Sequence, residues 1–233
     1  MPISLNVHGG GFRNCTLVTG FHGIGSTGYI AISYLVHSLQ AKRIGFVDVT
    51  HPPPFVSTSE DGLVTPFEVF RKGRLVFVKL EFAPHRTEEA EFAKVLARWA
   101  MNQKFKDAIL VGGLDSSLKS GKEDVRIVPT GSYLSNKSRF KYPTLEPGLF
   151  VYGQLAVMLS EFEMHDFPAV AILPYASAVA ADPSAAAVAV KTICKTFGIK
   201  VDVTDLEEGA KDIEEEFEKR MKQTSKSLQS MYG

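Results

Sequence analysis

Residues 15–40 decide the fold, and they read CTLVTGFHGIGSTGYIAISYLVHSLQ. Residues 15–19 combine β-branched and apolar side chains, which is the composition of a buried strand. Residues 20–28 are rich in glycine and predict a tight turn. Residues 29–40 then carry apolar side chains at helical spacing: Ile32, Leu35, Val36 and Leu39. A strand, a tight turn and a helix in succession are typical of an α/β fold.

The same alternation of strands and helices continues along the chain. We expect strands near residues 43–49, 63–70, 75–82, 108–111, 126–128, 169–173 and 199–203. We expect helices near residues 87–102, 153–163 and 183–197, and a final one over 205–221. This order predicts an α/β protein with a three-layer α/β/α sandwich, in which helices cover both faces of a central sheet.

Local signals define the ends of some of these elements. The helix 183–197 has Asp182 as its expected cap, Pro183 at its first position and Gly198 just past its end. Thr87 is the expected N-cap of the helix 87–102. The polar segment 115–147 predicts a long irregular region, which is usually functional, mobile or part of an interface. We assign residues 1–222 to a single α/β domain and residues 223–233 to a flexible C-terminal tail.

The composition excludes several classes of protein. A hydrophobic content of 45% and a charged content of 22% in 233 residues are ordinary for a soluble globular protein. Lys and Arg together number 26, as do Asp and Glu, so no overall charge favours nucleic acid or an anionic membrane. The basic cluster 137–141 therefore predicts a solvated loop. The apolar stretch 167–190 is interrupted by prolines and predicts protein core.

Catalytic and metal-binding patterns are weak in this sequence. Two separated cysteines without a CxxC pattern indicate reduced thiols, and we expect a cytoplasmic protein. The six histidines show no metal-ligand spacing, and no GxSxG elbow occurs, so we predict no metal site and no catalytic set. The segment 112–117 (GGLDSS) follows a buried strand. It predicts either a ligand-binding segment at the carboxyl edge of the sheet or a plain strand-ending turn.

The glycine-rich turn has a chemical interpretation of its own. Gly23, Gly25 and Gly28 match the GxGxxG pattern between a strand and a helix, and Asp48 follows at the end of the next strand. This is the spacing of a dinucleotide-binding site with its ribose-binding acid. Tyr29 stands where a phosphate-binding P-loop requires lysine, so that mechanism is not expected. The alternatives are a nucleotide- or nucleoside-binding enzyme or sensor, and a purely architectural turn.

The last three residues form the second candidate site. Met231, Tyr232 and Gly233 place an apolar side chain, a phenol and the terminal carboxylate in succession after a polar stretch. An aromatic ring supplies binding area at a low entropic cost, and a terminal carboxylate is captured by a cation or by backbone donors. The pattern predicts a docking tail; an ordinary disordered terminus is the alternative.

Several stretches, in their order, resemble the proteasome assembly chaperone 2 family. They are the glycine-rich turn with its helix, GLVTP (62–66), ILVGGL (109–114), DPSAAA (182–187) and VDVTDL (201–206). The likeness spans roughly residues 15–220 and is strongest to archaeal homo-oligomeric members. The resemblance implies a nucleoside phosphorylase-like α/β fold without phosphorylase activity, and a function that does not depend on ATP or another cofactor.

The resemblance also interprets the C-terminus. Proteasome activators and some assembly chaperones end in a hydrophobic residue, tyrosine and any residue, as this chain does. In those proteins the tail enters a pocket between adjacent proteasome α-subunits, where the carboxylate meets a lysine. Carried over, Met231 fills the apolar part, Tyr232 anchors the tail and the Gly233 carboxylate forms the ion pair. We therefore expect a non-enzymatic homo-oligomer whose partners are proteasome α-subunits or the core particle.

Overall fold

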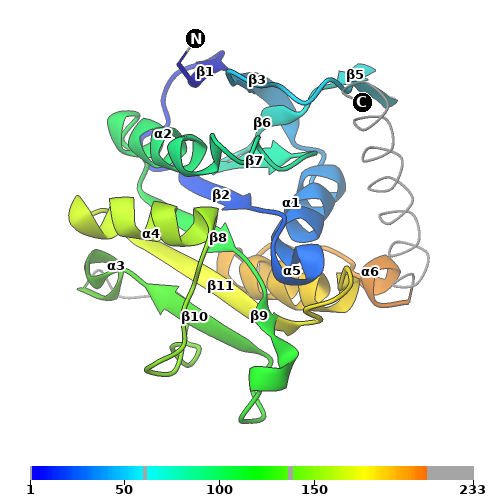
Figure 1. The fold of residues 1–233 in the computed structure, drawn as a ribbon, viewed down its shortest axis with the longest axis vertical. Helices are drawn as coiled ribbons and strands as arrows, with labels where there is room; N and C mark the ends of the chain where they lie inside the picture. Colours follow the sequence, from blue (N-terminus) through cyan, green and yellow to red (C-terminus); the bar gives the residue numbers. More distant parts are fainter. Residues whose placement is uncertain (1, 60–61, 136–138, 209–233) are drawn as a thin grey trace.

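A mixed β-sheet forms the centre of the molecule in the computed structural model, which describes residues 2–59, 62–135 and 139–208 (Figure 1). The neighbouring strands follow the order β1-β3-β6-β7-β2-β8-β11-β10, and β9 pairs with β11. Their bounds are β1 Ser4–Val7, β2 Thr16–Gly20, β3 Lys42–Asp48, β6 Phe67–Lys72, β7 Leu75–Leu80, β8 Asp107–Val111, β9 Leu114–Asp115, β10 Val125–Pro129 and β11 Ala169–Ala176. A separate two-stranded hairpin consists of β4 Ser57–Ser59 and β5 Gly62–Val64.

The parallel strands lie in the middle of this sheet. Strand β2 is parallel to both of its neighbours. In this register its Leu17 lies beside Val76 of β7 and Ala108 of β8. Strand β11 continues the parallel set beside β8, whereas β1, β3, β6 and β10 are antiparallel to their neighbours. The carboxyl ends of β2, β8 and β11 therefore meet at one edge of the sheet, which is where open α/β sheets bind ligands.

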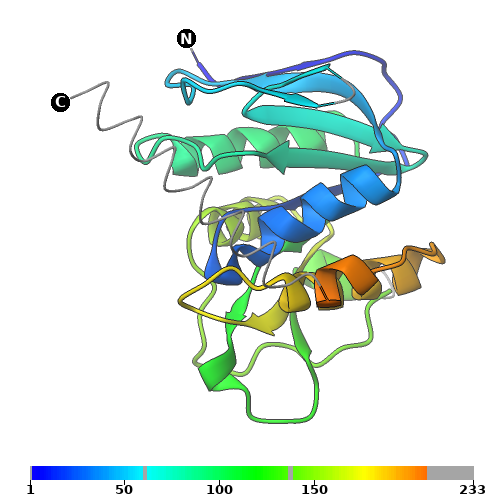
Figure 2. The ribbon, with the colours of Figure 1, turned by 90° about the vertical axis from the view of Figure 1, so that its right-hand side faces the viewer.

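Helices cover both faces of the sheet. Helices α1 (Thr27–Ser38) and α5 (Pro183–Phe197) pack against each other on one face, and Figure 2 views the molecule from that side. Helices α2 (Glu89–Asn102) and α4 (Gln154–Met164) pack together on the opposite face (Figure 1). Each face encloses its own apolar core. The predicted α/β class and its three-layer arrangement are confirmed.

The predicted ends of α5 are confirmed by its capping geometry. The Asp182 carboxylate accepts a hydrogen bond from the backbone N–H of Ala185 at 2.9 Å, and Pro183 occupies the first turn. Gly198 closes the helix in the left-handed conformation, with a φ of 65°. These three residues determine where the helix begins and ends, as the sequence predicts.

Other expected boundaries differ from the structure. Residues 199–203 form no strand; Val203 is instead buried, and Ile199 and Val201 half-buried, against the core under α1 and α5. Thr87 does not cap α2: the N-cap position is Glu88, and the Oγ1 of Thr87 contacts Nδ1 of His85 at 2.8 Å. The alternating apolar residues of the segment 199–203 therefore reflect packing against helices and not strand pairing.

Elsewhere the structure contains elements that the sequence did not predict, or divides predicted ones. The expected strand 63–70 is divided between β5 and β6, and β1 was not expected. The segment 115–147 contains β10 and the short helix α3 (Gly131–Ser135). The final helix begins as α6 (Thr204–Glu208), and the remainder of its predicted length lies outside the described residues, as does the tail 223–233.

Candidate functional site

The glycine-rich turn is closed by contacts between backbones. A β-carbon on Gly20 would lie 2.6 Å from Cα of Gly28. One on Gly28 would lie 2.4 Å from the carbonyl oxygen of Val111, at the end of β8. A β-carbon on Gly113 would lie 2.3 Å from the carbonyl oxygen of Ile24. These glycines allow β2, α1 and the end of β8 to approach one another closely, which is an architectural role.

Gly25 fastens the same turn to α5. Its φ of +62° favours glycine, and a β-carbon there would lie 2.8 Å from Cβ of Ala176 and 3.0 Å from Cβ of Asp182. Its carbonyl oxygen accepts a hydrogen bond from the backbone N–H of Asp182 at 2.8 Å. Gly23 differs, because a β-carbon on it would meet no atom within 4 Å, and it lines a pocket.

The structure does not bring Asp48 to the glycine-rich turn. Asp48 ends β3, and β6 and β7 lie between β3 and β2 in the sheet. Three strand spacings amount to about 14 Å. In a dinucleotide-binding fold the acid lies on the strand adjacent to the glycine-bearing strand. The turn therefore lacks the ribose-binding partner that the sequence pattern predicts.

A pocket of about 370 Å³ opens at the carboxyl ends of β2 and β8. Its lining includes apolar side chains from β8, β9, β11, α4 and the turn after β2: Phe21, Val111, Leu114, Leu155 and Leu173. Gly112, Gly113 and Asp115 also line it, so the segment 112–117 does lie at the expected edge of the sheet. We take this pocket as the candidate ligand site of the described chain.

The α4 side of the pocket was not predicted from the sequence. Phe150 and Tyr152 lie at the pocket with 81% and 68% of their surface exposed, and Gln154 begins α4 there. The signal that was available is the run GLFVYG at 148–153, in which two glycines with positive φ enclose exposed aromatic residues. Which edge of the sheet this run meets depends on the topology.

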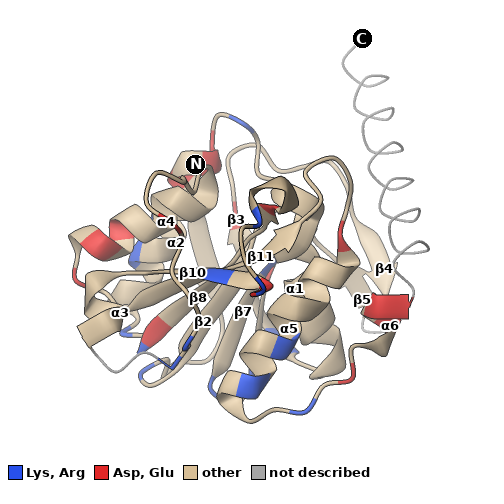
Figure 3. Ribbon diagram, turned by 90° about the horizontal axis from the view of Figure 1, so that it is seen from below, with Lys and Arg blue, Asp and Glu red and all other residues tan. Residues whose placement is uncertain are grey.

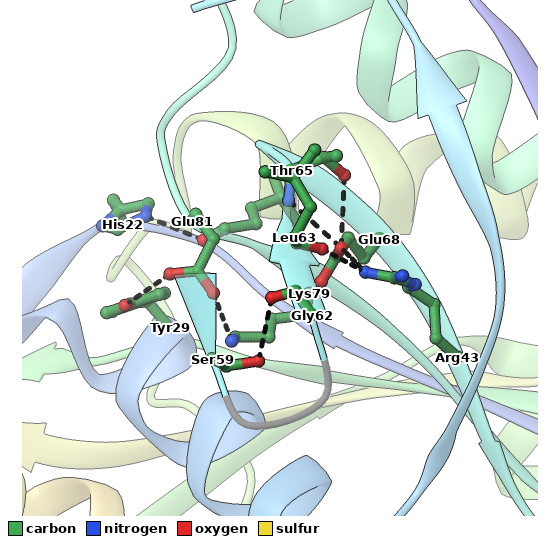
Figure 4. Close-up of polar contacts among 11 residues, drawn as sticks. His22, Tyr29, Arg43, Ser59, Gly62, Leu63, Thr65, Glu68, Lys79 and Glu81 are labelled. Carbon is green, nitrogen blue, oxygen red and sulfur yellow. Dashed lines mark hydrogen bonds and ion pairs between the residues drawn. The ribbon is translucent and has the colours of Figure 1, made fainter. Parts of the chain in front are cut away.

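A polar network borders the pocket at His22 (Figure 4). Its Nε2–H donates to the carbonyl oxygen of Leu80 at 3.1 Å, and its ring stacks on Tyr29 with centroids 4.4 Å apart. Tyr29 in turn donates its hydroxyl to Glu81 at 3.0 Å, and Glu81 pairs with Lys79. Burial lowers the pKa of His22, although Leu80 and Glu81 act in the opposite direction. The imidazole is therefore neutral near pH 7.

The same view shows a second network, which holds the β4–β5 hairpin (Figure 4). The buried carboxylate of Glu68 accepts hydrogen bonds from Arg43 at 2.7 Å and from the backbone N–H of Thr65 at 3.1 Å. Arg43 also donates to the carbonyl oxygen of Leu63 at 2.6 Å. These contacts link β3, β6 and the hairpin, and they indicate a structural role for Glu68.

Glu88 is a second buried acid with a structural role. Its carboxylate accepts hydrogen bonds from the backbone N–H groups of Thr50 at 3.0 Å and His51 at 3.1 Å. Burial alone would raise the pKa of Glu88, but the hydrogen bonds from Thr50 and His51 outweigh it and lower that pKa. The ionised carboxylate thus anchors the segment that follows β3.

The basic cluster 137–141 is represented in the described residues by Arg139 and Lys141. Arg139 pairs with the buried carboxylate of Asp107 and lies over the ring of Phe197 at 4.7 Å. Asp107 also accepts a hydrogen bond from the hydroxyl of Thr16 at 2.6 Å. Arg139 is thus part of the protein's own packing, and Phe140 beside it is buried, so the described part of this cluster is not the solvated loop that the sequence predicts.

Charges of both signs are spread over helices, strands and loops (Figure 3). Across the described ranges 2–59, 62–135 and 139–208, no group of three or more His, Cys, Asp or Glu residues is arranged to hold a metal ion. In the same part of the chain, no helix has the length and apolar character to cross a membrane. The predicted docking residues Met231, Tyr232 and Gly233 lie outside the described residues.

Comparison with known proteins places these features in a family. Archaeal structures with related folds include PbaA of Pyrococcus furiosus, a homolog of proteasome-assembly chaperone. Its TM-score is 0.85 at 21% identity, over 97% of this chain and 100% of PbaA. PbaB of the same organism, an archaeal proteasome activator, has a TM-score of 0.72 at 18% identity, over 94% of this chain and 99% of PbaB.

Two sequence comparisons agree with the structural ones. The uncharacterized protein MJ1210 of Methanocaldococcus jannaschii is 22% identical over 215 residues, which cover 89% of this chain and 83% of MJ1210. A model of the PAC2 family matches residues 17–221, nearly the whole chain. The chain therefore belongs to the PAC2 family.

Proposed function

We propose that this chain is a homo-oligomeric, proteasome assembly chaperone-like protein that binds proteasome α-subunits or α-rings through its C-terminus. The observation that carries the proposal is membership of the PAC2 family in a chain that ends in Met231, Tyr232 and Gly233. The fold likeness to PbaA and PbaB supports the same role, since one is a homolog of proteasome-assembly chaperone and the other an archaeal proteasome activator.

The chemistry of the tail supports docking into a pocket between subunits. Tyr232 contributes a rigid ring whose hydroxyl needs a hydrogen-bond partner when it is buried. Met231 adds adaptable apolar area, and the Gly233 carboxylate pairs with a cation. A plug of three residues binds weakly by itself. Several tails on one oligomer gain about 100-fold in apparent affinity when their tethers match the spacing of the pockets.

The packing of the glycine-rich turn supports a function that uses neither a bound nucleotide nor catalysis. The space at Gly20, Gly25 and Gly28 is taken by β8, α5 and the turn itself, and Asp48 lies three strand spacings from β2. We place the protein in the cytoplasm, with its partner. The alternative, a nucleotide- or nucleoside-binding enzyme or sensor that uses the Gly23–Gly28 loop, predicts a rise in melting temperature with millimolar NAD, ATP or nucleosides.

Point variants of the tail test the docking hypothesis. Immobilised α-subunits are titrated with the full-length protein and with the Tyr232→Ala, Met231→Ala and Ser230→Ala variants. We expect Tyr232→Ala to weaken binding about tenfold or more and Met231→Ala to weaken it less. Ser230→Ala, outside the three-residue plug, serves as the control and retains binding.

A second variant tests the position of the carboxylate. Adding two alanines after Gly233 keeps the side chains of Met231 and Tyr232 but moves the terminal charge. We expect this extension to weaken binding as much as Tyr232→Ala does, because the ion pair is lost. If the extended protein and the Tyr232→Ala variant both bind like the full-length protein, the tail is not the docking element.

A further inference from the structure

We propose that a basic strip at the amino end of the sheet binds the acidic segment 205–218 of a second copy of this chain. This end, opposite the pocket, is where the parallel strands β2, β7 and β8 begin. The strip consists of six exposed cationic residues at the ends of strands: Arg13, Lys42, Lys72, Arg74, Lys104 and Lys106. The inference rests on the proposed homo-oligomer and identifies the surface through which its copies meet.

The topology of the sheet brings the six residues of the strip together. Strand β6 is antiparallel to both β3 and β7, so it ends where β3 and β7 begin. Strands β2 and β8 begin at the same end, because both are parallel to β7 or to each other. These strands are neighbours in the order β3-β6-β7-β2-β8, so the strip extends over four strand spacings, or about 19 Å.

Backbone hydrogen bonds around the start of β2 hold the centre of the strip. The N–H of Thr16 donates to the carbonyl oxygen of Arg74 at 2.8 Å, and the N–H of Lys106 donates to that of Cys15 at 2.8 Å. Arg74 and Lys106 therefore flank β2 on its two sides. Their exposed side chains are carried by the paired backbone of the central sheet, so the positive charges have a fixed spacing at their base.

The positive charge of the strip is not compensated within the described chain. None of its six side chains forms an ion pair with a described residue. Asp107, which follows the strip at the start of β8, is buried and already paired with Arg139. Glu163 and Asp166 lie farther along the sheet, before β11. Neighbouring like charges repel one another, so the strip is stabilised by contact with an anionic surface.

The chain itself contains an acidic segment that matches the strip. Residues 205–218 read DLEEGAKDIEEEFE, with eight Asp and Glu residues and one Lys. The segment begins in α6, where Asp205, Glu207 and Glu208 are exposed. The chain as a whole has a net charge of zero, so no general field attracts nucleic acid. Charge complementarity therefore favours this segment as the occupant of the strip.

The described acids of this segment do not meet the strip of their own chain. Glu207 pairs with Lys191 of α5 at 2.6 Å, and neither Asp205 nor Glu208 forms an ion pair with a described residue. The contact is therefore made with a neighbouring copy. It joins two different surfaces, which makes it heterologous, the type of contact that builds rings when the rotation between copies closes. Residues 219–233 then remain as the tether and the docking plug.

A mixture of two cysteine variants tests whether the contact joins two copies. Full-length Lys106→Cys and Glu215→Cys proteins are mixed and treated with a short bismaleimide. The native thiols of Cys15 and Cys194 are buried, which limits their reaction. We expect a covalent dimer from the mixture and from neither variant alone. Lys122→Cys, at the opposite end of the sheet, replaces Lys106→Cys in the control. A yield no higher than that of the control would contradict the assignment.

Charge reversals at the strip measure its contribution to assembly. The double variant Arg74→Glu with Lys106→Glu is compared with Arg86→Glu with Lys122→Glu, which reverses two exposed cations at the opposite end of the sheet. Melting curves establish that both fold, and analytical ultracentrifugation measures self-association. We expect the strip variant to raise the Kd of the oligomer about tenfold or more, and the control to leave it unchanged. Equal Kd values for the two variants would overturn the proposal.

The outcomes separate this contact from the proposed function on which it rests. A monomeric unmodified protein contradicts the homo-oligomer itself, and with it the contact. An oligomer that the strip reversals leave intact contradicts only the contact. If those reversals spare the oligomer but abolish binding to a DNA duplex, the strip serves nucleic acid and the proposal is overturned. Both double variants keep Met231, Tyr232 and Gly233, so docking of the tail is tested independently.

Discussion

At the scale of the single residue, Gly28 has no room for a β-carbon. A methyl group there would meet backbone atoms of Val111 and Phe21 at 2.4 and 2.6 Å, so β8 or α1 would have to move. We expect Gly28→Ala to lower the free energy of unfolding by about 1–3 kcal/mol. Gly23→Ala is the matched control, because its added methyl group meets no atom within 4 Å. Urea unfolding followed by circular dichroism measures both, and equal effects would refute the packing account.

Glu88 makes stability depend on pH. Its pKa is lowered in the folded protein, so its ionised form stabilises the fold above the unfolded pKa of about 4.5, and this contribution disappears as the pH falls through the lower folded pKa. We expect Glu88→Gln to cost about 1 kcal/mol at pH 7 and progressively less below pH 4.5. Urea unfolding between pH 7 and pH 3 tests this. Glu91→Gln, at an exposed position on α2, should show no such trend.

At the scale of the element, α5 depends on its N-terminal cap. The two Asp182 oxygens accept hydrogen bonds from the N–H groups of Ala185 and Ser177, each at 2.9 Å. We expect Asp182→Ala to lower the free energy of unfolding by about 1–2 kcal/mol. Asp182→Asn can keep the bond from Ala185 but loses the acceptor for Ser177, so we expect a cost between zero and that of alanine. No loss of stability for Asp182→Ala would contradict the capping account.

How far an element could be predicted depended on whether its signal is local. The ends of α5 were predictable because a cap, a proline and a glycine act on their own neighbours. Residues 199–203 were wrongly expected to be a strand, because Ile199, Val201 and Val203 alternate as strand residues do. Here alternation arises from burial against helices, without strand pairing. Thr87 was a reasonable cap from sequence, but its hydroxyl contacts the neighbouring His85, and the helix begins after Glu88, whose carboxylate binds the distant backbone of Thr50.

The candidate site divides in the same way. The segment 112–117 was predictable as a possible ligand edge because it directly follows a buried strand. The contribution of Gln154 was not, since the position of α4 over Gly112 depends on the tertiary fold. The GxGxxG pattern was misleading about Asp48 for a topological reason. Strand β3, which follows β2 along the chain and ends at Asp48, is separated from β2 in the sheet by β6 and β7.

At the scale of the whole molecule, the described body and the C-terminal tail have distinct proposed roles. The three-layer body has charges of both signs spread over it (Figure 3), and we assign its basic strip to contact between copies. We assign the binding of proteasome α-subunits to the last three residues, multiplied by oligomerisation.

The most direct test of the docking account is a pull-down of recombinant proteasome α-subunits. It compares the full-length protein with a version that ends at Ser230, with melting temperatures measured alongside. We predict that the full-length protein retains the α-subunits, that the shortened protein loses them, and that the two melt at the same temperature. Retention of α-subunits by both proteins would contradict the account and move the contact to the folded body.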